Sequence, residues 1–326
     1  MNDQLVEKIP SLDLHDFTSG DAEKKNKFVQ DLGEAFQSIG FVAIRNHGLS
    51  DTLTKDLYDA VKKFFSLPDE IKQKYERLDL AGQRGYIGKG KEHAKGRNTG
   101  DLKEFYHVGQ ELSAAELKAE NYPANIWPDE VPGFKETTLT AYRALEKAGQ
   151  DMLRAIALYL DLPENYFDDK VHHGNSILRQ IHYFPIADPD SVPADAVRAA
   201  EHGDINLITL LMGASADGLQ VLRRDGKWIP ITALPEQIVV NVGDMLSRHT
   251  NNKLKSTIHR VVNPPRELMH TSRYSIPFFM HPRSEMDLSC LESCIDAENP
   301  KAYTDITAGD FLTERLIELG LLKNKK

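Results

Sequence analysis

The chain has 326 residues, of which 40% are hydrophobic and 27% are charged, and its formal net charge is −9. This composition is typical of a globular protein that is long enough to bury a large core. The acidic balance argues against a nucleic-acid-binding protein, because contacts with phosphate groups require clustered Lys and Arg.

Cysteine content and hydropathy narrow the class of protein further. Two cysteines, Cys290 and Cys294, are too few for a secreted scaffold held together by disulfides. No run of about 18 apolar residues predicts a membrane span, and the acidic start MNDQLVEKIP lacks the apolar core of a signal peptide. We therefore expect a cytoplasmic protein with no membrane or nucleic-acid partner.

The first third of the chain alternates helical and extended patterns. Apolar side chains at helical spacing predict a helix over 21–39, and a short strand is expected over 41–44. Asn46-His47-Gly48 predicts a turn, and Ser50 is expected to cap a second helix. Residues 79–103 are rich in Gly, Lys and Arg without periodicity, which predicts a loop.

The second half has a different character. A long helix is expected over 134–161, and after residue 174 short extended runs follow one another between turn residues such as Asp225-Gly226 and Gly243-Asp244. These runs are 176–184, 206–213, 218–223, 228–232, 237–242, 256–262 and 273–280. Many short strands predict a sandwich, jelly roll or barrel, with helices from the first half and from 309–322 around it.

A metal-ligand pattern lies within this β region. His202-Gly203-Asp204 is an H-x-D motif at the entry to a strand, and side chains two residues apart in a strand point to the same side. His259 follows 55 residues later in the predicted strand 256–262. Two imidazoles and one carboxylate form the facial triad of non-haem Fe(II), which leaves three positions of an octahedral ion open.

A second pattern follows on the last predicted strand. Arg273 and Ser275 lie 14 and 16 residues after His259 and are expected to share one face of their strand. A guanidinium inside a β core needs an anion, because a buried unpaired charge is costly. A dicarboxylate that binds the metal at one end would supply that anion at its other end.

Taken in order, these motifs resemble the 2-oxoglutarate- and Fe(II)-dependent dioxygenases of the isopenicillin N synthase-like family. The resemblance covers nearly the whole chain and also includes the segments 9–14, 40–48, 64–68, 101–109, 178–183 and 241–244. It implies an α+β fold with a double-stranded β-helix (jelly-roll) core and flanking helices. The regions expected from it are an N-terminal helix/strand region (1–120), a long helical segment (121–173), the jelly-roll core (174–285) and a helical tail (286–326).

The resemblance also implies roles for single residues. His202, Asp204 and His259 match the iron ligands, and the residues that match the 2-oxoglutarate-binding set are Arg273, Ser275 and Tyr183. The implied activity couples oxidative decarboxylation of 2-oxoglutarate, to succinate and CO2, to the oxidation of a small organic substrate. Fe(II) would be the cofactor, with 2-oxoglutarate and O2 as cosubstrates.

The substrate side and two alternative functions stay open at this point. We expect the substrate pocket to be lined by Arg84, Tyr86, Phe105 and Arg179. One alternative is an isopenicillin N synthase-like oxidase, which uses Fe(II) and O2 without 2-oxoglutarate and holds its substrate through R-x-S. The other is a non-catalytic metal-binding barrel.

Overall fold

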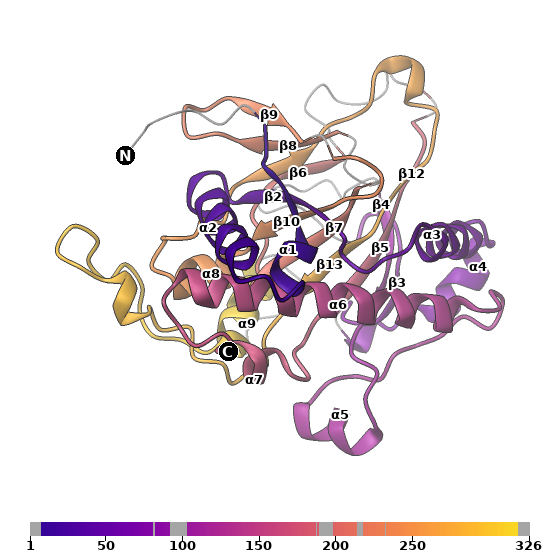
Figure 1. Cartoon of the computed structure of the whole chain (residues 1–326). Coiled ribbons are helices and arrows are strands. Elements are labelled where there is room, and N and C mark those ends of the chain that lie inside the picture. Colours follow the sequence, from indigo (N-terminus) through magenta and orange to yellow (C-terminus); the bar gives the residue numbers. More distant parts are fainter. Residues whose placement is uncertain are drawn as a thin grey trace.

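Two antiparallel sheets and a layer of helices make up the fold (Figure 1). The computed structural model describes residues 8–80, 82–91, 103–186, 188, 198–213, 218–231 and 233–318. Within these residues every strand pairing is antiparallel except that of β1 with β2.

In the described part of the chain, the larger sheet has nine strands and the smaller sheet has four. In spatial order the larger sheet contains β1 (Ser11–Asp13), β2 (Phe41–Arg45), β10 (Ile238–Val242), β7 (Ile208–Met212), β13 (Pro277–Met280), β5 (Ile177–Tyr183), β4 (Lys103–Val108) and β3 (Gly85–Ile87), and β12 (Arg273–Ser275) also pairs with β5. The smaller sheet contains β6 (Ala199–His202), β11 (His259–Val261), β8 (Leu219–Leu222) and β9 (Trp228–Pro230).

Helices cover one face of the larger sheet, and Figure 1 shows the long α6 running along it. The helices are α1 (Leu14–Thr18), α2 (Ala22–Ser38), α3 (Asp51–Phe65), α4 (Asp69–Lys72), α5 (Ala114–Glu120), α6 (Phe134–Tyr159), α7 (Asp168–Val171), α8 (Asp244–His249) and α9 (Ala308–Glu318). Both α2 and α3 pack against α6, and α6 contacts β7 and β13. Among the described residues, no helix combines the length and the apolar character needed to cross a bilayer.

Strand β10 contributes side chains to two different apolar cores. Its side chains alternate, because successive residues of a strand point to opposite faces. Ile238, Val240 and Val242 belong to the large core under the helices. Val239 belongs to a second core, which it shares with Val221 and Val261 of the smaller sheet. We call the face of the larger sheet that meets the smaller sheet the inner face.

Most elements expected from the sequence are confirmed. The structure contains the predicted helices as α2, α3, α6 and α9, and the cap is present, since the Ser50 hydroxyl accepts a hydrogen bond from the Leu53 amide at 3.1 Å. The predicted hairpin at Asp225-Gly226 joins β8 to β9, and Gly226 has a φ of +81°. The last part of the predicted helix, 319–322, lies outside the described residues.

Three expectations are wrong. The predicted loop 79–103 contains strand β3, which is paired with β4, while its residues 81 and 92–102 lie outside the described residues. Gly243-Asp244 does not form a simple turn, because Asp244 begins helix α8. The predicted strand 273–280 is divided at Ile276 into β12 and β13, which pair with different parts of β5.

Candidate metal centre

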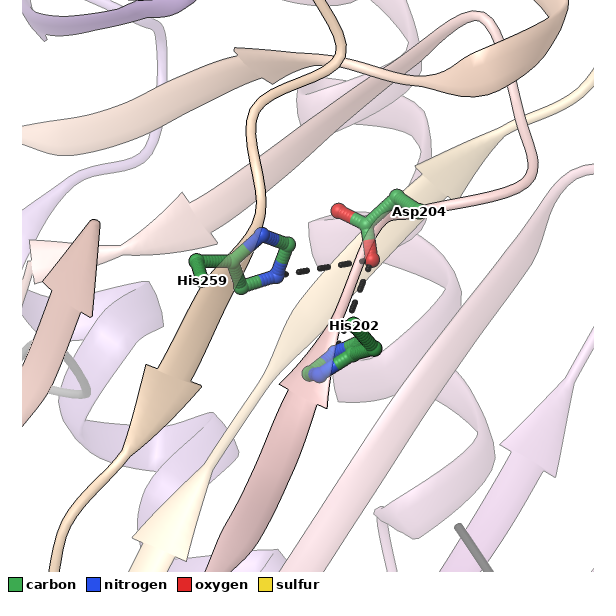
Figure 2. Close-up of side chains that lie close together, drawn as sticks. All are labelled: His202, Asp204 and His259. Carbon is green, nitrogen blue, oxygen red and sulfur yellow. Dashed lines mark ion pairs between the residues drawn. The ribbon is translucent and has the colours of Figure 1, made fainter. Parts of the chain in front are cut away.

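Strand pairing brings the three predicted metal ligands together. His202 ends β6, and His259 begins β11 as its direct cross-strand partner. Asp204 follows β6 by two residues, and the three side chains point toward one another (Figure 2). Asp204 Oδ1 lies 3.7 Å from His259 Nε2 and 4.0 Å from His202 Nε2.

An irregularity in β6 directs His202 into the site. Ala199, three residues earlier, pairs with Val261 and is buried in the core between the sheets. Residues three apart in a regular strand point to opposite faces. The register shifts by one residue between the two pairs, so both side chains face inward.

Backbone hydrogen bonds prepare both imidazoles to bind a metal. His202 Nδ1 lies 2.7 Å from the Ala200 carbonyl oxygen, and His259 Nδ1 lies 3.1 Å from the Thr257 carbonyl oxygen. A carbonyl can only accept, so each Nδ1 carries the proton and donates it. The lone pair of each Nε2 is then available to a metal ion.

The two oxygens of Asp204 have separate roles. Oδ2 accepts hydrogen bonds from Thr209 Oγ1 at 2.6 Å and from Asn241 Nδ2 at 2.8 Å, which leaves Oδ1 facing the histidines. Burial alone would raise the pKa of Asp204, but His259, His202 and these hydrogen bonds outweigh burial and lower it. The carboxylate is therefore held in its charged form.

His202 lies at the edge of the site and is neutral at neutral pH. Although 46% of its side-chain surface is exposed, the protein atoms packed around the ring, together with His259, lower the pKa of His202 to about 4. Asp204 opposes this shift but does not reverse it. A neutral imidazole is the form that binds metal.

These donors fit a divalent metal ion. One nitrogen from each histidine and one oxygen of Asp204 lie within 4.8 Å of one another. Donors bound to one octahedral ion at about 2.1 Å lie about 3 Å apart, so small side-chain rotations would close the site. In each of the three side chains, the polar atom that does not face the others is hydrogen-bonded to the protein.

The backbone of Asp204 is also fixed. The amide of Asp244, the first residue of α8, donates to the Asp204 carbonyl oxygen at 2.7 Å. A Cβ on Gly243 would lie 2.1 Å from the Asn206 carbonyl oxygen, so only glycine permits this contact. Gly203, between the two ligands, faces Asp244 and Ser256, since a Cβ there would lie 3.2 Å from an oxygen of each.

The three residues expected to bind 2-oxoglutarate lie together on the inner face. In the pairing of β12 with β5, Arg273 is opposite Tyr183 and Ser275 is opposite Ile181. The Arg273 guanidinium carbon lies 5.0 Å from the centre of the Tyr183 ring. Ser275 and Tyr183 are buried.

Of the four expected pocket residues, Phe105 and Arg179 share this inner face. Phe105 packs in an apolar cluster with Ile181 and Tyr183. The Arg179 guanidinium carbon lies 4.4 Å from the Phe105 ring and 5.4 Å from the Phe279 ring. Phe279 is the cross-strand partner of Thr209, and Thr209 donates a hydrogen bond to Asp204. Arg179 is therefore close to residues that contact the triad.

Arg84 and Tyr86 point the other way. Tyr86 donates to Glu104 Oε2 at 2.6 Å and packs on the Phe64 ring of α3, on the helix side of the sheet. Arg84 has no exposed surface, and its Nη1 donates to the Gln83 carbonyl oxygen at 2.8 Å. These placements argue against both as pocket residues. Successive residues of a strand point to opposite faces, and this places the Tyr86 side chain of β3 on the helix side. The predicted loop did not include this alternation.

Sequence reasoning missed the residues that support the ligands. Thr209 and Asn241 come from the neighbouring strands β7 and β10, where they are cross-strand partners. Their only sequence signal is a polar residue inside an otherwise apolar strand. A buried ionic cluster behind the inner face was also missed: Glu104 accepts from Lys72 Nζ at 2.8 Å and pairs with His182 Nδ1 at 2.7 Å.

Comparisons with known proteins agree with this geometry. A family described as non-haem dioxygenase in morphine synthesis N-terminal matches residues 9–130, and the 2OG-Fe(II) oxygenase superfamily matches residues 174–282. A 2-oxoglutarate-Fe(II) type oxidoreductase (ppzD) of Metarhizium majus is 33% identical, with 95% of each chain covered. The similar oxidoreductase hxnY of Emericella nidulans is 33% identical, with 93% of this chain and 88% of hxnY covered.

Solved structures give the same result. A full-length protein of Neurospora crassa in complex with alpha-KG has a TM-score of 0.85 at 32% identity, with 97% of each chain covered. The same Neurospora protein was also crystallised with alpha-KG and thymine. A 2OG-Fe(II) oxygenase family structure from Caulobacter crescentus has a TM-score of 0.85 at 42% identity, with 96% of this chain and 99% of that chain covered.

Proposed function

Because the chain belongs to the 2-oxoglutarate–Fe(II) oxygenase superfamily, we propose that its Fe(II) is held by His202, Asp204 and His259. The chain is a non-haem oxygenase, an enzyme that couples oxidative decarboxylation of 2-oxoglutarate to the oxidation of a substrate. The oxidase that works without 2-oxoglutarate is not supported, since relatives are named for this cosubstrate and the Neurospora protein was crystallised with alpha-KG. The non-catalytic alternative is likewise unsupported, since the relatives are named as oxidoreductases.

One observation carries the proposed metal site. Each of the three side chains has one donor atom directed at the others, and its second polar atom is already hydrogen-bonded to the protein. When bound, Fe(II) with 2-oxoglutarate supplies the activation of O2. The protein orients the ligands, keeps Nε2 of both imidazoles free of a proton and holds Asp204 ionised.

The proposed cosubstrate site uses Arg273, Ser275 and Tyr183. A guanidinium and two hydroxyl groups gathered on one buried face suit the far carboxylate of 2-oxoglutarate. These residues lie on the larger sheet, across the sandwich from the strands that carry the histidines. A dicarboxylate could therefore extend from the metal on one sheet to Arg273 on the other.

We further propose that the substrate is a small organic molecule, and that Phe105 and Arg179 contact it. The Neurospora protein, a structural relative, was crystallised with thymine and with 5-formyluracil. Arg179 is held in place, because its Nε donates to His107 Nε2 at 2.6 Å while His107 Nδ1 donates to the Gly82 carbonyl oxygen at 2.6 Å. Stacked on Phe105 and Phe279, its guanidinium suits a planar or acidic group.

The test is succinate release from 2-oxoglutarate by the Fe(II)-loaded protein under O2, with and without a panel of small metabolites. The wild type should bind one Fe(II) and release succinate, faster with a suitable substrate. His202→Ala, Asp204→Ala and His259→Ala should each lose both properties. The control, His15→Ala, replaces an exposed histidine outside the triad and should retain them. Full activity in Asp204→Ala would refute the metal assignment.

A further inference from the structure

A second arginine, Arg198, lies beside the proposed cosubstrate site. It immediately precedes β6 and is only 7% exposed. Its Nη2 donates to the Thr271 carbonyl oxygen at 3.2 Å, whereas its Nε is buried without a hydrogen-bond partner in the described structure. Because a buried guanidinium with an unused donor is costly, its position calls for an additional partner.

Arg198 and Arg273 converge on one tyrosine. Their guanidinium carbons lie 6.0 and 5.0 Å from the centre of the Tyr183 ring. Burial lowers the pKa of Arg198, and the positive charge of Arg273 lowers it further, with Tyr183 opposing both. No carboxylate among the described residues contributes to this shift, so within the described part of the chain two cations lie together there and no anion is paired with Arg198.

An arginine of this chain that is paired with a carboxylate is arranged differently. Arg154, on α6, donates to both oxygens of Asp168 at 2.8–3.3 Å, and this carboxylate raises the pKa of Arg154. Arg198 therefore differs from Arg154 in being more buried and in having no carboxylate partner among the described residues. An anion from outside the chain would satisfy it.

We propose that Arg198 and Arg273 together bind the far carboxylate of 2-oxoglutarate, as a two-arginine clamp beside Tyr183. The inference rests on the proposed function, because it needs 2-oxoglutarate in the site, but it assigns a role to a residue outside the R-x-S motif. A carboxylate accepts several hydrogen bonds at once, and those from guanidinium groups are among the strongest in proteins. The bound carboxylate would also offset the repulsion between the two cations.

The position of Arg198 along the chain agrees with this role. It lies four residues before His202, at the start of the segment that leads directly into β6. Four residues of extended chain span about 13 Å, and an arginine side chain can reach back over part of that length. The segment 198–202 would thus bind the cosubstrate at both ends, through the metal at His202 and through the far carboxylate at Arg198.

Anaerobic calorimetric titration of 2-oxoglutarate into the Fe(II)-loaded protein tests the clamp without relying on turnover. Arg198→Met should weaken 2-oxoglutarate binding by about 10- to 100-fold, as expected for one charged hydrogen-bonding partner. Arg198→Lys should recover part of the loss. The control, Arg154→Met, removes an arginine that is paired elsewhere and should bind 2-oxoglutarate as the wild type does.

A shorter probe distinguishes contact with the far carboxylate from a general disturbance. 2-Oxobutyrate keeps the metal-binding keto acid but lacks the second carboxylate, so Arg198→Met should bind it as the wild type does. The double variant Arg198→Met/Arg273→Met should lose less affinity for 2-oxoglutarate than the product of the two single losses, because both side chains act on one group.

Each outcome has a distinct meaning. Wild-type affinity for 2-oxoglutarate in Arg198→Met, with the loss confined to Arg273→Met, would overturn the clamp and leave the proposed function intact. Equal weakening toward 2-oxoglutarate and 2-oxobutyrate would also overturn it, since that indicates a structural effect. A wild-type protein that binds Fe(II) but no 2-oxoglutarate would instead contradict the proposed cosubstrate site. If Arg198→Met does not fold, Arg198→Lys with the two keto acids decides between the same outcomes.

Discussion

At the scale of single residues, the two carboxylate oxygens of Asp204 have different roles in the proposed metal site. Its Oδ2 is occupied by Thr209 and Asn241, so its Oδ1 cannot rotate away from the histidines without breaking two buried hydrogen bonds. Such supporting contacts orient metal ligands, and their loss commonly costs about 10- to 100-fold in metal affinity or activity.

We therefore expect Thr209→Val to weaken Fe(II) binding by about 10- to 100-fold while the protein stays folded. The change keeps the shape of the side chain and removes the donor to Asp204. Anaerobic Fe(II) titration measures the effect. Thr138→Val is a matched control, because Thr138 is also buried and hydrogen-bonded, to Gln180 on the helix side of the sheet. Equal affinities in the two variants would contradict a supporting role for Thr209.

Glu104 is a buried carboxylate that is surrounded by hydrogen-bond donors. Burial alone would raise the pKa of Glu104, but hydrogen bonds from His182, Lys72 and Tyr86 outweigh burial and lower it below the ordinary value of 4.5. A lowered carboxyl pKa stabilises the folded state above the ordinary value, and this contribution is lost as the pH falls through the lowered pKa.

Glu104→Gln should accordingly destabilise the protein at pH 7 by about 3–5 kcal/mol, because it leaves buried Lys72 without its charged partner. The difference from the wild type should shrink as the pH falls below 4.5. Urea unfolding at several pH values measures both effects. Glu164→Gln is the control, since its pair with Lys25 is partly exposed and should contribute less than about 1 kcal/mol. A pH-independent difference for Glu104→Gln would contradict the assigned ionisation.

At the scale of elements, periodicity explains which parts of the fold could be predicted. Helix α6 has a continuous apolar stripe, and β7 and β10 are short apolar runs between turn residues. By contrast, β4 has the sequence KEFYHV and all six of its residues are buried. Its Glu104 is buried because its partners Lys72 and His182 come from other elements, so no alternation of polar and apolar residues marks the strand.

The residue types of the proposed metal site follow from the sequence, but the way in which the fold brings them together does not. H-x-D and a later histidine suggest two imidazoles and one carboxylate. That His202 faces His259 depends on the β6–β11 register and on its one-residue shift, which a short strand of sequence AAEH does not reveal. Arg198 carries no motif at all and becomes notable only through its burial beside Tyr183.

Helix α2 packs against α6 with a glycine at the contact. A Cβ on Gly33 of α2 would lie 2.0 Å from the ring of Tyr159 at the end of α6, whose hydroxyl donates to Gln37. Gly33→Ala should therefore destabilise the protein by about 1–3 kcal/mol by overpacking, although alanine favours helix. In a Tyr159→Ala background the same change should be neutral or stabilising. Unfolding free energies of the four proteins form the cycle, and equal effects in both backgrounds would contradict the clash.

At the scale of the whole molecule, the proposed active site joins the two sheets. The histidines lie on β6 and β11 of the smaller sheet, and Arg273 and Tyr183 lie on β12 and β5 of the larger sheet. The links between the halves within the described protein include the hydrogen bonds from Thr209 and Asn241 to Asp204. Fe(II) and 2-oxoglutarate, bound between the two sheets, would add a further link. This link would exist only in the folded protein, because the unfolded chain does not form the site.

Removal of the ligands should accordingly lower the thermal stability of the whole protein. A ligand that binds only the folded state stabilises it by about 2.7 kcal/mol at 100 times its Kd. Under anaerobic conditions, Fe(II) and then 2-oxoglutarate should each raise Tm, and a chelator should reverse both increments because the cosubstrate binds through the metal. Asp204→Ala should show neither increment, whereas Arg273→Met should keep the first and lose most of the second. A full second increment in Arg273→Met would mean that Arg273 does not bind the cosubstrate, and would contradict a link between the two sheets through this side chain.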